Sequence, residues 1–344
     1  MAFRVGINGF GRIGRLALRL LLEHAPAVEV VAINDRGDAE INGYLFQYDS
    51  NYGPFPGHIA TRADMLVVND RPIRLFSKPS PAEIPWRACG VDLVIESTGV
   101  FADAKAARAH LDAGATRVLV TAPSKNADAT LVAGVNENQF DRARHCVVSA
   151  ASCTTNCLAP VAKILHDAFG IAHGTMATIH AYTNDQRILD KSHKDPRRSR
   201  AGAANIIPTT TGATKALGLV LPDLAGKIGG IAYRVPTLTV SVLDLTVALQ
   251  RPATPRAVNE AFAAASANGM RGILAYCAAP LVSADFKGNP HSSIIDGLST
   301  QFVEGSALTR VVAWYDNEWG YAARIADLTR FIADGTRAWQ EVNQ

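Results

Sequence analysis

The segment 152–157 (Ser-Cys-Thr-Thr-Asn-Cys) places a nucleophilic residue type at the junction of two predicted elements. The apolar run 146–151 before it predicts a buried strand, and apolar residues at helical spacing follow it over 158–169. Unpaired backbone N–H groups and the helix dipole favour an anion at such a junction, so we expect a lowered pKa for the thiol of Cys153. Cys153 is therefore a candidate nucleophile, whereas Cys157, one helical turn later, is expected to be a buried structural thiol.

A histidine in the same half of the chain is the candidate base. His180 lies near the end of the apolar and β-branched run 175–181, which predicts a strand. A histidine ending a buried strand is often only a core residue, but beside a reactive thiol it forms a nucleophile–base pair. The turn 208–212 (Pro-Thr-Thr-Thr-Gly) offers donors suited to phosphate and is equally typical of an ordinary helix cap.

The N-terminal segment carries a pattern typical of dinucleotide binding. The glycine-rich segment 9–14 (Gly-Phe-Gly-Arg-Ile-Gly) follows the predicted strand 3–8 and opens a helical pattern. A second predicted strand, 28–33, leads to Asp35. In this context the glycines let the backbone approach a pyrophosphate at the helix N-terminus, and the acidic residue can bind the adenosine ribose.

The other elements of the first half predict an α/β domain. Strands and helices alternate there, which indicates a parallel, doubly wound, Rossmann-like sheet. The expected strands are 91–96, 117–121 and 146–149, with a helix at 104–113. Such sheets bind ligands at the carboxyl ends of their strands, the predicted positions of Ser97-Thr98-Gly99 and Thr121.

The second half predicts an α+β domain. Long β-branched and apolar runs indicate a mixed or antiparallel sheet, with strands expected at 175–181, 231–235, 240–250 and 309–314. Helices are expected from Pro255 onward and over 318–332. We therefore expect a dinucleotide-binding domain at 1–151, completed by a C-terminal helix at 318–344, and a catalytic domain at 152–317.

Composition limits the class of protein. The 344 residues are 48% apolar and 19% charged, as in an ordinary globular protein, and no apolar run is long enough to span a membrane. The first predicted strand begins at Phe3, so no signal peptide is expected. The five cysteines are odd in number and lack zinc-ligand spacing, which favours reduced thiols in the cytoplasm and no metal site.

The net charge of +3 is concentrated in one segment. Residues 185–200 contain six basic and three acidic side chains. A solvated loop, a site for phosphorylated small molecules and a nucleic-acid surface are all compatible with this charge. The absence of aromatic residues among the basic ones disfavours single-stranded nucleic acid.

Taken together, the chain resembles the phosphorylating glyceraldehyde-3-phosphate dehydrogenases over essentially its whole length. The matching segments are 6–14, 152–157, 193–195, 208–212, 234–237 and 314–321. Six such segments in the family's order make a chance match implausible.

The resemblance implies a mechanism. Cys153 attacks the aldehyde carbon of D-glyceraldehyde 3-phosphate, and His180 takes the proton and stabilises the developing charge. Hydride then passes to NAD+ or NADP+, and inorganic phosphate cleaves the thioester to 1,3-bisphosphoglycerate. The nearest rival activity is that of an erythrose-4-phosphate dehydrogenase, and a rival of another class is an RNA- or protein-binding role for the loop 185–200.

The resemblance also implies roles for further residues. The substrate phosphate is expected on Thr183, Arg198 and Arg234. The attacking phosphate is expected on Ser152, Thr154, Thr211 and Gly212. The cofactor is expected on Asn8, Gly9, Gly11, Arg12, Ile13, Gly14, Asp35, Ser97, Thr98, Gly99, Thr121 and Asn317, with Asn317 at the nicotinamide. The loop 185–200 is expected at the centre of a homotetramer, where it lines a neighbour's cofactor site.

Several positions depart from the family pattern. The usual residues are replaced by Ala150, Ala181, Leu238-Thr239 and, near the adenine, Pro79. At the ribose end, Arg36 and Gly37 follow Asp35, and Lys191-Ser192 precede His193, a pattern similar to that of NADP-using relatives. We therefore expect Arg36, Lys191 and Ser192 to contact a 2′-phosphate, so that NADP is accepted beside NAD, although Asp35 opposes this by charge repulsion.

Overall fold

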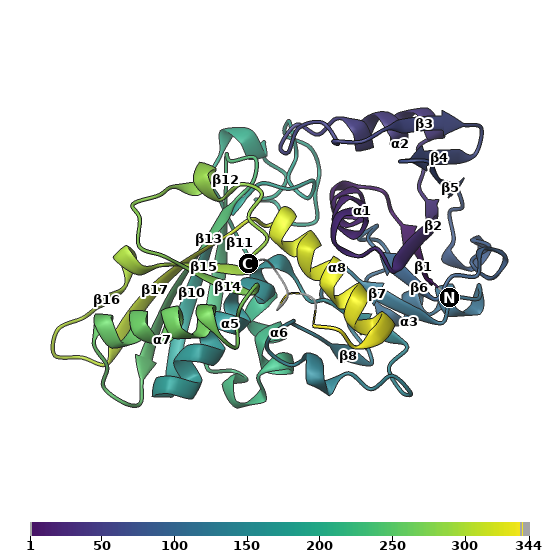
Figure 1. Cartoon of the computed structure of the whole chain (residues 1–344). Coiled ribbons are helices and arrows are strands. Elements are labelled where there is room, and N and C mark those ends of the chain that lie inside the picture. Colours follow the sequence, from purple (N-terminus) through teal and green to yellow (C-terminus); the bar gives the residue numbers. More distant parts are fainter. Residues whose placement is uncertain (1, 338, 340–344) are drawn as a thin grey trace. The chain divides into compact units, whose positions relative to one another are not determined.

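The computed structural model describes residues 2–337 and 339, which form two compact units (Figure 1). The first unit contains residues 2–131, 137–151 and 322–337. The second contains residues 132–136, 152–321 and 339. In the described residues no helix has the length and apolar character needed to cross a membrane.

The first unit is built on a nine-stranded sheet with the order β3-β4-β5-β2-β1-β6-β7-β9-β8. Its strands are β1 (Phe3–Asn8), β2 (Val28–Asn34), β3 (Ile59–Arg62), β4 (Met65–Val68), β5 (Arg71–Phe76), β6 (Leu93–Glu96), β7 (Arg117–Val120), β8 (Ala129–Thr130) and β9 (Val147–Ser149). Its helices are α1 (Arg12–His24), α2 (Ala39–Gln47), α3 (Ala104–Ala107) and α4 (Ala109–Asp112).

The centre of this sheet is parallel, which confirms the predicted Rossmann-like fold. β5, β2, β1, β6, β7 and β9 run parallel to one another. All four residues of β6 and the last four of β1 are buried, as expected for strands covered on both faces. The antiparallel edge β3-β4-β5 was not expected, and the predicted helix 104–113 is divided into α3 and α4.

The second unit is built on a mixed, mostly antiparallel sheet with the order β11-β12-β10-β13-β17-β15-β14, and β16 pairs with β17. Its strands are β10 (Ile171–Ala181), β11 (Ile207–Thr209), β12 (Ile228–Val235), β13 (Ser241–Leu249), β14 (Leu274–Cys277), β15 (Ser293–Asp296), β16 (Gln301–Phe302) and β17 (Leu308–Tyr315). Its helices are α5 (Cys153–Phe169), α6 (Ala213–Val220) and α7 (Pro255–Ala267), and α8 (Trp319–Asp334) begins here and continues in the first unit.

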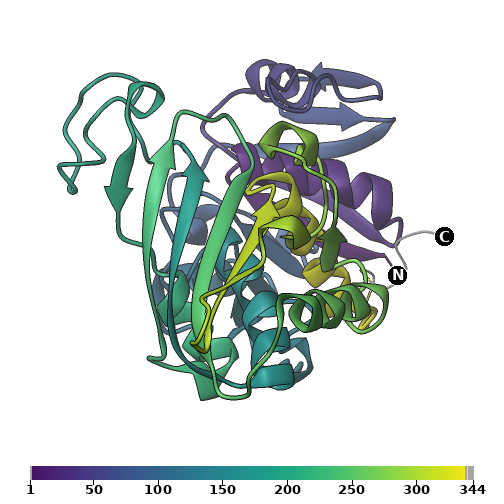
Figure 2. The same cartoon turned by 90° about the vertical axis from the view of Figure 1, so that its left-hand side faces the viewer.

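Two pairings in this sheet determine the positions of the site residues. β10 runs parallel to β12, with His180 opposite Arg234, and antiparallel to β13. Helix α5 packs against β10, β13, β15 and β17 (Figure 1). The segment that follows β10 extends away from the sheet of its own unit (Figure 2).

Candidate active site

The structure brings the candidate nucleophile and the candidate base together. Cys153 is the first residue of α5, and the Ser152 hydroxyl caps that helix by accepting a hydrogen bond from the backbone N–H of Thr155 at 3.1 Å. His180 lies near the end of β10, and its Nε2 is 3.4 Å from the Sγ of Cys153. This separation allows a proton to pass directly between the two side chains.

The electrostatic environment of Cys153 differs from the one expected. Burial raises the pKa of the Cys153 thiol, and the nearby positive charge of Arg234 only partly opposes this effect. Burial, followed by the charge of Arg234, lowers the pKa of His180 to about 3. The expectation of a lowered pKa for the Cys153 thiol was therefore wrong, because the effect of burial outweighs the charge of Arg234.

Arg234 contacts the other side of the imidazole. Its Nη1 lies 2.7 Å from the Nδ1 of His180 and 3.3 Å from the carbonyl oxygen of Ala181. The Nε atom of Arg234 is buried and has no hydrogen-bond partner among the described residues. A half-buried guanidinium with an unused, buried donor is suited to an oxyanion.

Tyr315 is a neighbour of this pair that the sequence did not single out. Its hydroxyl lies 3.0 Å from the Oγ1 of Thr154 and 2.7 Å from the Oγ1 of Thr178. Its ring packs edge-on against that of His180, with 6.0 Å between the centroids. The hydroxyl of Thr154, expected to bind phosphate, is thus hydrogen-bonded to Tyr315.

A narrow pocket borders the thiol. It is lined by Cys153, Asn156, Ser292, Tyr315, Asp316, Gly320 and Tyr321. The buried carboxylate of Asp316 accepts hydrogen bonds from Thr239 Oγ1 and from the backbone N–H groups of Gly288, Glu318 and Trp319, at 2.9–3.0 Å. Asp316 therefore holds the turn at the start of α8 in place beside the thiol.

Asn317 follows this carboxylate and is held by a serine that sequence reasoning missed. The Ser241 hydroxyl donates to the Oδ1 of Asn317 at 2.9 Å and accepts from the backbone N–H of Ala181 at 3.1 Å. The Ser241 hydroxyl therefore links the orientation of the Asn317 carboxamide to the backbone of Ala181, the residue that follows His180. Ser241 is the first residue of β13, in which buried and partly buried residues alternate. Its position at the start of the predicted strand 240–250 was its only signal in the sequence.

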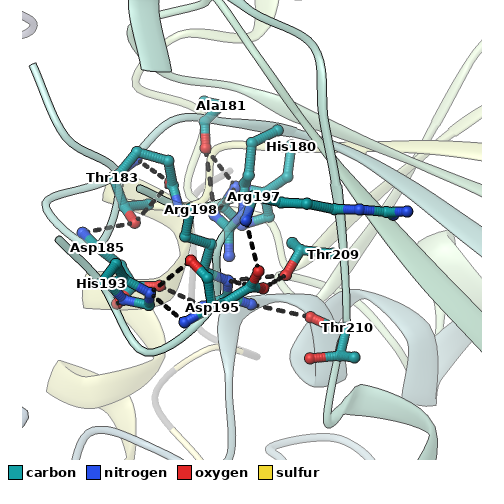
Figure 3. Close-up of polar contacts among 12 residues, drawn as sticks. His180, Ala181, Thr183, Asp185, His193, Asp195, Arg197, Arg198, Thr209 and Thr210 are labelled. Carbon is teal, nitrogen blue, oxygen red and sulfur yellow. Dashed lines mark hydrogen bonds and ion pairs between the residues drawn. The ribbon is translucent and has the colours of Figure 1, made fainter. Parts of the chain in front are cut away.

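The loop 185–200 folds back on residues 209 and 210, as Figure 3 shows. Arg198 is ion-paired with Asp185, and its Nε and Nη2 donate to the Thr209 hydroxyl at 2.8 Å and to the Thr210 carbonyl at 3.0 Å. The Thr183 hydroxyl donates to the side chain of Gln186 at 3.2 Å. Thr183 and Arg198, expected to bind phosphate with Arg234, are thus hydrogen-bonded to other residues of the chain.

The turn 208–212 caps α6. The Thr211 hydroxyl accepts a hydrogen bond from the backbone N–H of Ala213 at 3.2 Å, and Gly212 precedes the helix. Accepting this bond leaves the hydroxyl hydrogen of Thr211 available to donate. The cap and the phosphate interpretations of this turn are therefore compatible.

In the first unit, a cavity of about 300 Å³ lies at the carboxyl ends of the parallel strands. Its lining residues are Asn8, Gly9, Gly11, Asn34, Asp35, Arg36, Lys78, Pro79, Pro81, Ser97, Thr98, Val100 and Phe101. A Cβ at Gly14 would lie 2.2 Å from the Gly9 carbonyl oxygen, whereas a Cβ at Gly11 would point into open space. The closely packed loop and the open approach to its backbone fit a dinucleotide pyrophosphate.

Other residues predicted to bind the cofactor lie outside the lining of this cavity. They are Arg12, Ile13, Gly14, Gly99, Thr121, Lys191, Ser192 and Asn317. Arg12 is ion-paired with Asp49, and the Thr121 hydroxyl donates to the Glu96 carbonyl at 3.1 Å. Lys191 and Ser192 are exposed in the loop of the second unit.

A buried polar network beneath this cavity was also missed. The indole N–H of Trp86 donates to the Nδ1 of His110 at 2.9 Å, so the proton of the neutral ring is on Nε2, which donates to Glu96 at 3.0 Å. The Glu96 carboxylate also accepts from the Asn8 amide and from the backbone N–H of Thr98. Two lining residues of the cavity are thus fixed by one buried carboxylate.

Comparison with known proteins connects both sites to one family. A family model described as "Glyceraldehyde 3-phosphate dehydrogenase, C-terminal domain" matches residues 152–317, and one described as "Glyceraldehyde 3-phosphate dehydrogenase, NAD binding domain" matches residues 3–104. The chain belongs to the glyceraldehyde-3-phosphate dehydrogenase family.

Similar full-length members of the glyceraldehyde-3-phosphate dehydrogenase family occur in several bacteria. The Geobacillus stearothermophilus enzyme is 52% identical over 333 residues, which cover 97% of this chain and 99% of the relative. Glyceraldehyde-3-phosphate dehydrogenase 1 of Bacillus subtilis has the same identity and coverage. Glyceraldehyde-3-phosphate dehydrogenase 2 of Streptomyces avermitilis is 50% identical over 334 residues. These matches confirm the resemblance found in the sequence motifs.

One departure from the pattern of this dehydrogenase family stays without a structural reason. Ala150 is fully buried, and its backbone N–H donates to the Val120 carbonyl at 2.9 Å. Nothing in the structure explains why alanine replaces the family's asparagine here.

Proposed function

We propose that this family member converts D-glyceraldehyde 3-phosphate, NAD+ and inorganic phosphate into 1,3-bisphosphoglycerate and NADH. The observation that carries this proposal is the 3.4 Å contact between Cys153 Sγ and His180 Nε2, with the donors of Arg234 beside it. A thiol, a neutral base and a guanidinium are the groups that acyl transfer to phosphate requires.

The chemistry of this pair follows from its geometry. The Sγ of Cys153 attacks the aldehyde carbon while the Nε2 of His180 takes the thiol proton, and the resulting imidazolium donates to the substrate oxygen. Bound NAD+ would supply the hydride acceptor. As hydride leaves the carbon, the Nε2 of His180 takes back the hydroxyl proton, and the hemithioacetal becomes a thioester on Cys153. An oxygen of inorganic phosphate then attacks the thioester carbon, and the Cys153 thiolate leaves and regains the proton held by His180.

Two phosphate groups need cationic or hydroxyl partners in this scheme. We assign the substrate phosphate to Arg234, Arg198 and Thr183. We assign the attacking phosphate to a second set of residues, Ser152, Thr154, Thr211 and Gly212. The unused donor of Arg234 and the free hydroxyl hydrogen of Thr211 support this assignment. Arg198 must leave its ion pair with Asp185 to bind the substrate phosphate. The free energy of breaking that ion pair therefore reduces the contribution of Arg198 to phosphate binding.

The first unit is assigned to the cofactor, with Asp35 on the adenosine ribose and Asn8, Ser97 and Thr98 at the strand ends. Asn317 of the second unit is assigned to the nicotinamide carboxamide. Arg36 and Lys78 line the cavity beside Asp35, which supports acceptance of NADP as well as NAD. The 2′-phosphate of NADP would be attracted by the two cations and repelled by the carboxylate.

We also propose a cytoplasmic homotetramer in which the loop 185–200, including Lys191 and Ser192, lines the cofactor site of a neighbouring subunit. Ile188 and Leu189 in this loop are 89% and 77% exposed, so they offer apolar surface to another chain. The five free cysteines support a reducing compartment.

A steady-state assay tests the proposed function. Glyceraldehyde 3-phosphate and erythrose 4-phosphate are each supplied with NAD+ or NADP+, in the presence and absence of inorganic phosphate. Phosphate-dependent turnover of glyceraldehyde 3-phosphate supports the proposal. Preferred, phosphate-independent oxidation of erythrose 4-phosphate, or NADH formation by Cys153→Ser at the wild-type rate, would overturn it. Absence of turnover with retained RNA binding would favour the non-enzymatic alternative.

A further inference from the structure

The backbone of Val240 lies in a conformation that its side chain disfavours. Its φ is 68°, in the left-handed region. Six non-glycine residues have a positive φ among those that the structure describes, and Val240 is the only β-branched one, since the others are alanine, asparagine and aspartate. Such a conformation persists only where the surrounding structure enforces it, and residues of this kind gather at functional sites.

The residues on either side of Val240 bind the turn between β17 and α8. The Thr239 hydroxyl donates to the Oδ1 of Asp316 at 2.9 Å, and the Ser241 hydroxyl donates to the Oδ1 of Asn317 at 2.9 Å. All five residues are buried, so water competes little for these hydrogen bonds. Thr239 occupies one of the positions at which the chain departs from the family pattern. Two consecutive residues of the turn are therefore held by the two residues that flank Val240.

The bend at Val240 brings the two hydroxyls to neighbouring partners. In an extended chain, residues two positions apart point to the same face and lie about 7 Å apart. A left-handed residue bends the chain instead, as glycine does in one class of β-bulge. Ser241 pairs with Tyr315 in the register of β13 and β17 and accepts from the backbone N–H of Ala181, so its place is fixed by the sheet. The direction of the chain at Val240 then determines where the Thr239 hydroxyl lies.

The side chain of Val240 keeps this bend in place. It is buried in an apolar cluster with Phe286 and Ile294, and Trp314 packs against the cluster. Because buried side chains are close-packed, Val240 cannot turn to the extended conformation without moving its branched side chain out of these contacts. The packing therefore enforces a backbone conformation that a branched residue would not adopt alone.

We propose that Val240 is a positioning residue for the nicotinamide end of the cofactor. The apolar cluster holds Val240 in the left-handed conformation, and that conformation holds the turn 316–317 through the hydroxyls of Thr239 and Ser241. This inference rests on the proposed assignment of Asn317 to the nicotinamide carboxamide. Val240 thus contributes to the affinity for NAD+ although it is assigned no contact with the cofactor.

The test measures the Kd of full-length variants for NAD+ and for ADP-ribose by calorimetry. ADP-ribose lacks the nicotinamide, so it does not use Asn317. Val240→Ala and Val240→Gly both remove the methyl groups that pack in the cluster, but only glycine adopts the left-handed conformation without strain. We expect Val240→Ala to raise the Kd for NAD+ roughly two- to tenfold, which corresponds to the loss of about one hydrogen bond, and Val240→Gly to stay close to the wild-type value. Neither variant should change the Kd for ADP-ribose.

A second pair of variants tests the same positioning without altering residue 240. Thr239→Val keeps the shape of threonine and lacks the hydroxyl, so we expect it to raise the Kd for NAD+ and not that for ADP-ribose. Thr239→Ser keeps the hydroxyl and should keep the wild-type Kd for both. Val303→Ala, at an exposed position, is the control for the loss of a valine side chain and should change neither Kd.

Equal Kd values for NAD+ in Val240→Ala and Val240→Gly, or a Kd for ADP-ribose that rises with that for NAD+, would overturn the proposal. A wild-type Kd for NAD+ in Thr239→Val would overturn it as well, whether or not the variants of Val240 fold. The proposed function is judged separately, by phosphate-dependent turnover. A protein that turns over without these differences in Kd contradicts only the inference, and one that shows them without turnover contradicts only the function.

Discussion

The hydroxyl of Tyr315 lies 3.0 Å from the hydroxyl of Thr154, the residue that follows the candidate nucleophile. The same phenol contacts Thr178 on β10 at 2.7 Å. A single buried group at the end of β17 therefore ties the first turn of α5 to the strand that carries His180.

Tyr315→Phe is expected to destabilise the second unit. It leaves the hydroxyls of Thr154 and Thr178 without their partner in a buried site, which costs about 1–3 kcal/mol in the free energy of unfolding. The measurement is urea unfolding. Tyr48→Phe is the matched control because Tyr48 is exposed, and an equal effect of the two variants would contradict the bridging role.

Ser241→Ala is expected to weaken the hold on the Asn317 carboxamide without touching the reacting thiol. A net contribution of about 0.5–1.5 kcal/mol per hydrogen bond corresponds to a rise of roughly two- to tenfold in KM for NAD+. The KM for the aldehyde should stay unchanged, and this split separates positioning of the cofactor from general damage. Ser306→Ala, in an exposed turn, is the control. An equal rise in the KM for NAD+ and the KM for the aldehyde would count against a role of Ser241 in positioning Asn317.

Glu96→Gln is expected to weaken NAD binding from beneath the cavity. A glutamine places an N–H group among donors from Asn8, Thr98 and His110, and the mismatch costs about 1–3 kcal/mol. Calorimetric titration with NAD+ should show a weaker Kd, with a lower melting temperature. Glu29→Gln, on an exposed position of β2, should change neither. An unaltered Kd in Glu96→Gln would show that the network does not position the lining residues.

His180 makes stability depend on pH in a defined direction. Its pKa falls from the ordinary value of 6.5 to about 3 on folding, so the unfolded chain binds the extra proton. The contribution of His180 to the free energy of unfolding is fully present above pH 6.5. It is lost as the pH falls toward 3, by up to about 1.4 kcal/mol per pH unit.

His180→Gln should therefore lose less stability than the wild type between pH 6.5 and 4, as measured by urea unfolding at several pH values. His173→Gln, on an exposed position of the same strand, should follow the wild type. If the free energy of unfolding changed with pH in the same way in all three proteins, the lowered pKa of His180 would be contradicted.

Arg36→Ala tests the use of NADP. Hydrogen bonds to a charged group contribute about 1.5–3 kcal/mol, so kcat/KM for NADP+ should fall at least tenfold while that for NAD+ is retained. Lys191→Ala tests the proposed contribution of the loop 185–200 of a neighbouring subunit to this site, and Arg62→Ala, on an exposed part of β3, is the control. A cofactor preference that neither variant alters would remove Arg36 and Lys191 from the site.

Local sequence patterns predicted the elements that carry the motifs. Strand β1 was expected at 3–8 and has those bounds, and the α5 junction lies at Cys153 as the change from apolar run to helical spacing indicated. Periodicity and glycine spacing are local signals, and they were sufficient for these elements.

The features that were missed depend on contacts between distant residues. The raised pKa of Cys153 results from burial by the surrounding sheet, which outweighs the charge of Arg234. Tyr315 acquires its role from residues 161 and 137 positions away along the chain. The ion pair of Arg198 with Asp185 also follows from how the loop folds rather than from its composition.

The register that places His180 opposite Arg234 has a consequence for the order of events during folding. The two residues are 54 positions apart and meet only when β10 pairs with β12. Closing such a long segment is slow compared with forming a helix, so we expect helical structure to form before Arg234 and His180 meet. A refolding chain is then expected to recover helical circular dichroism first, and the contact between Arg234 and His180 to form late, with the native sheet.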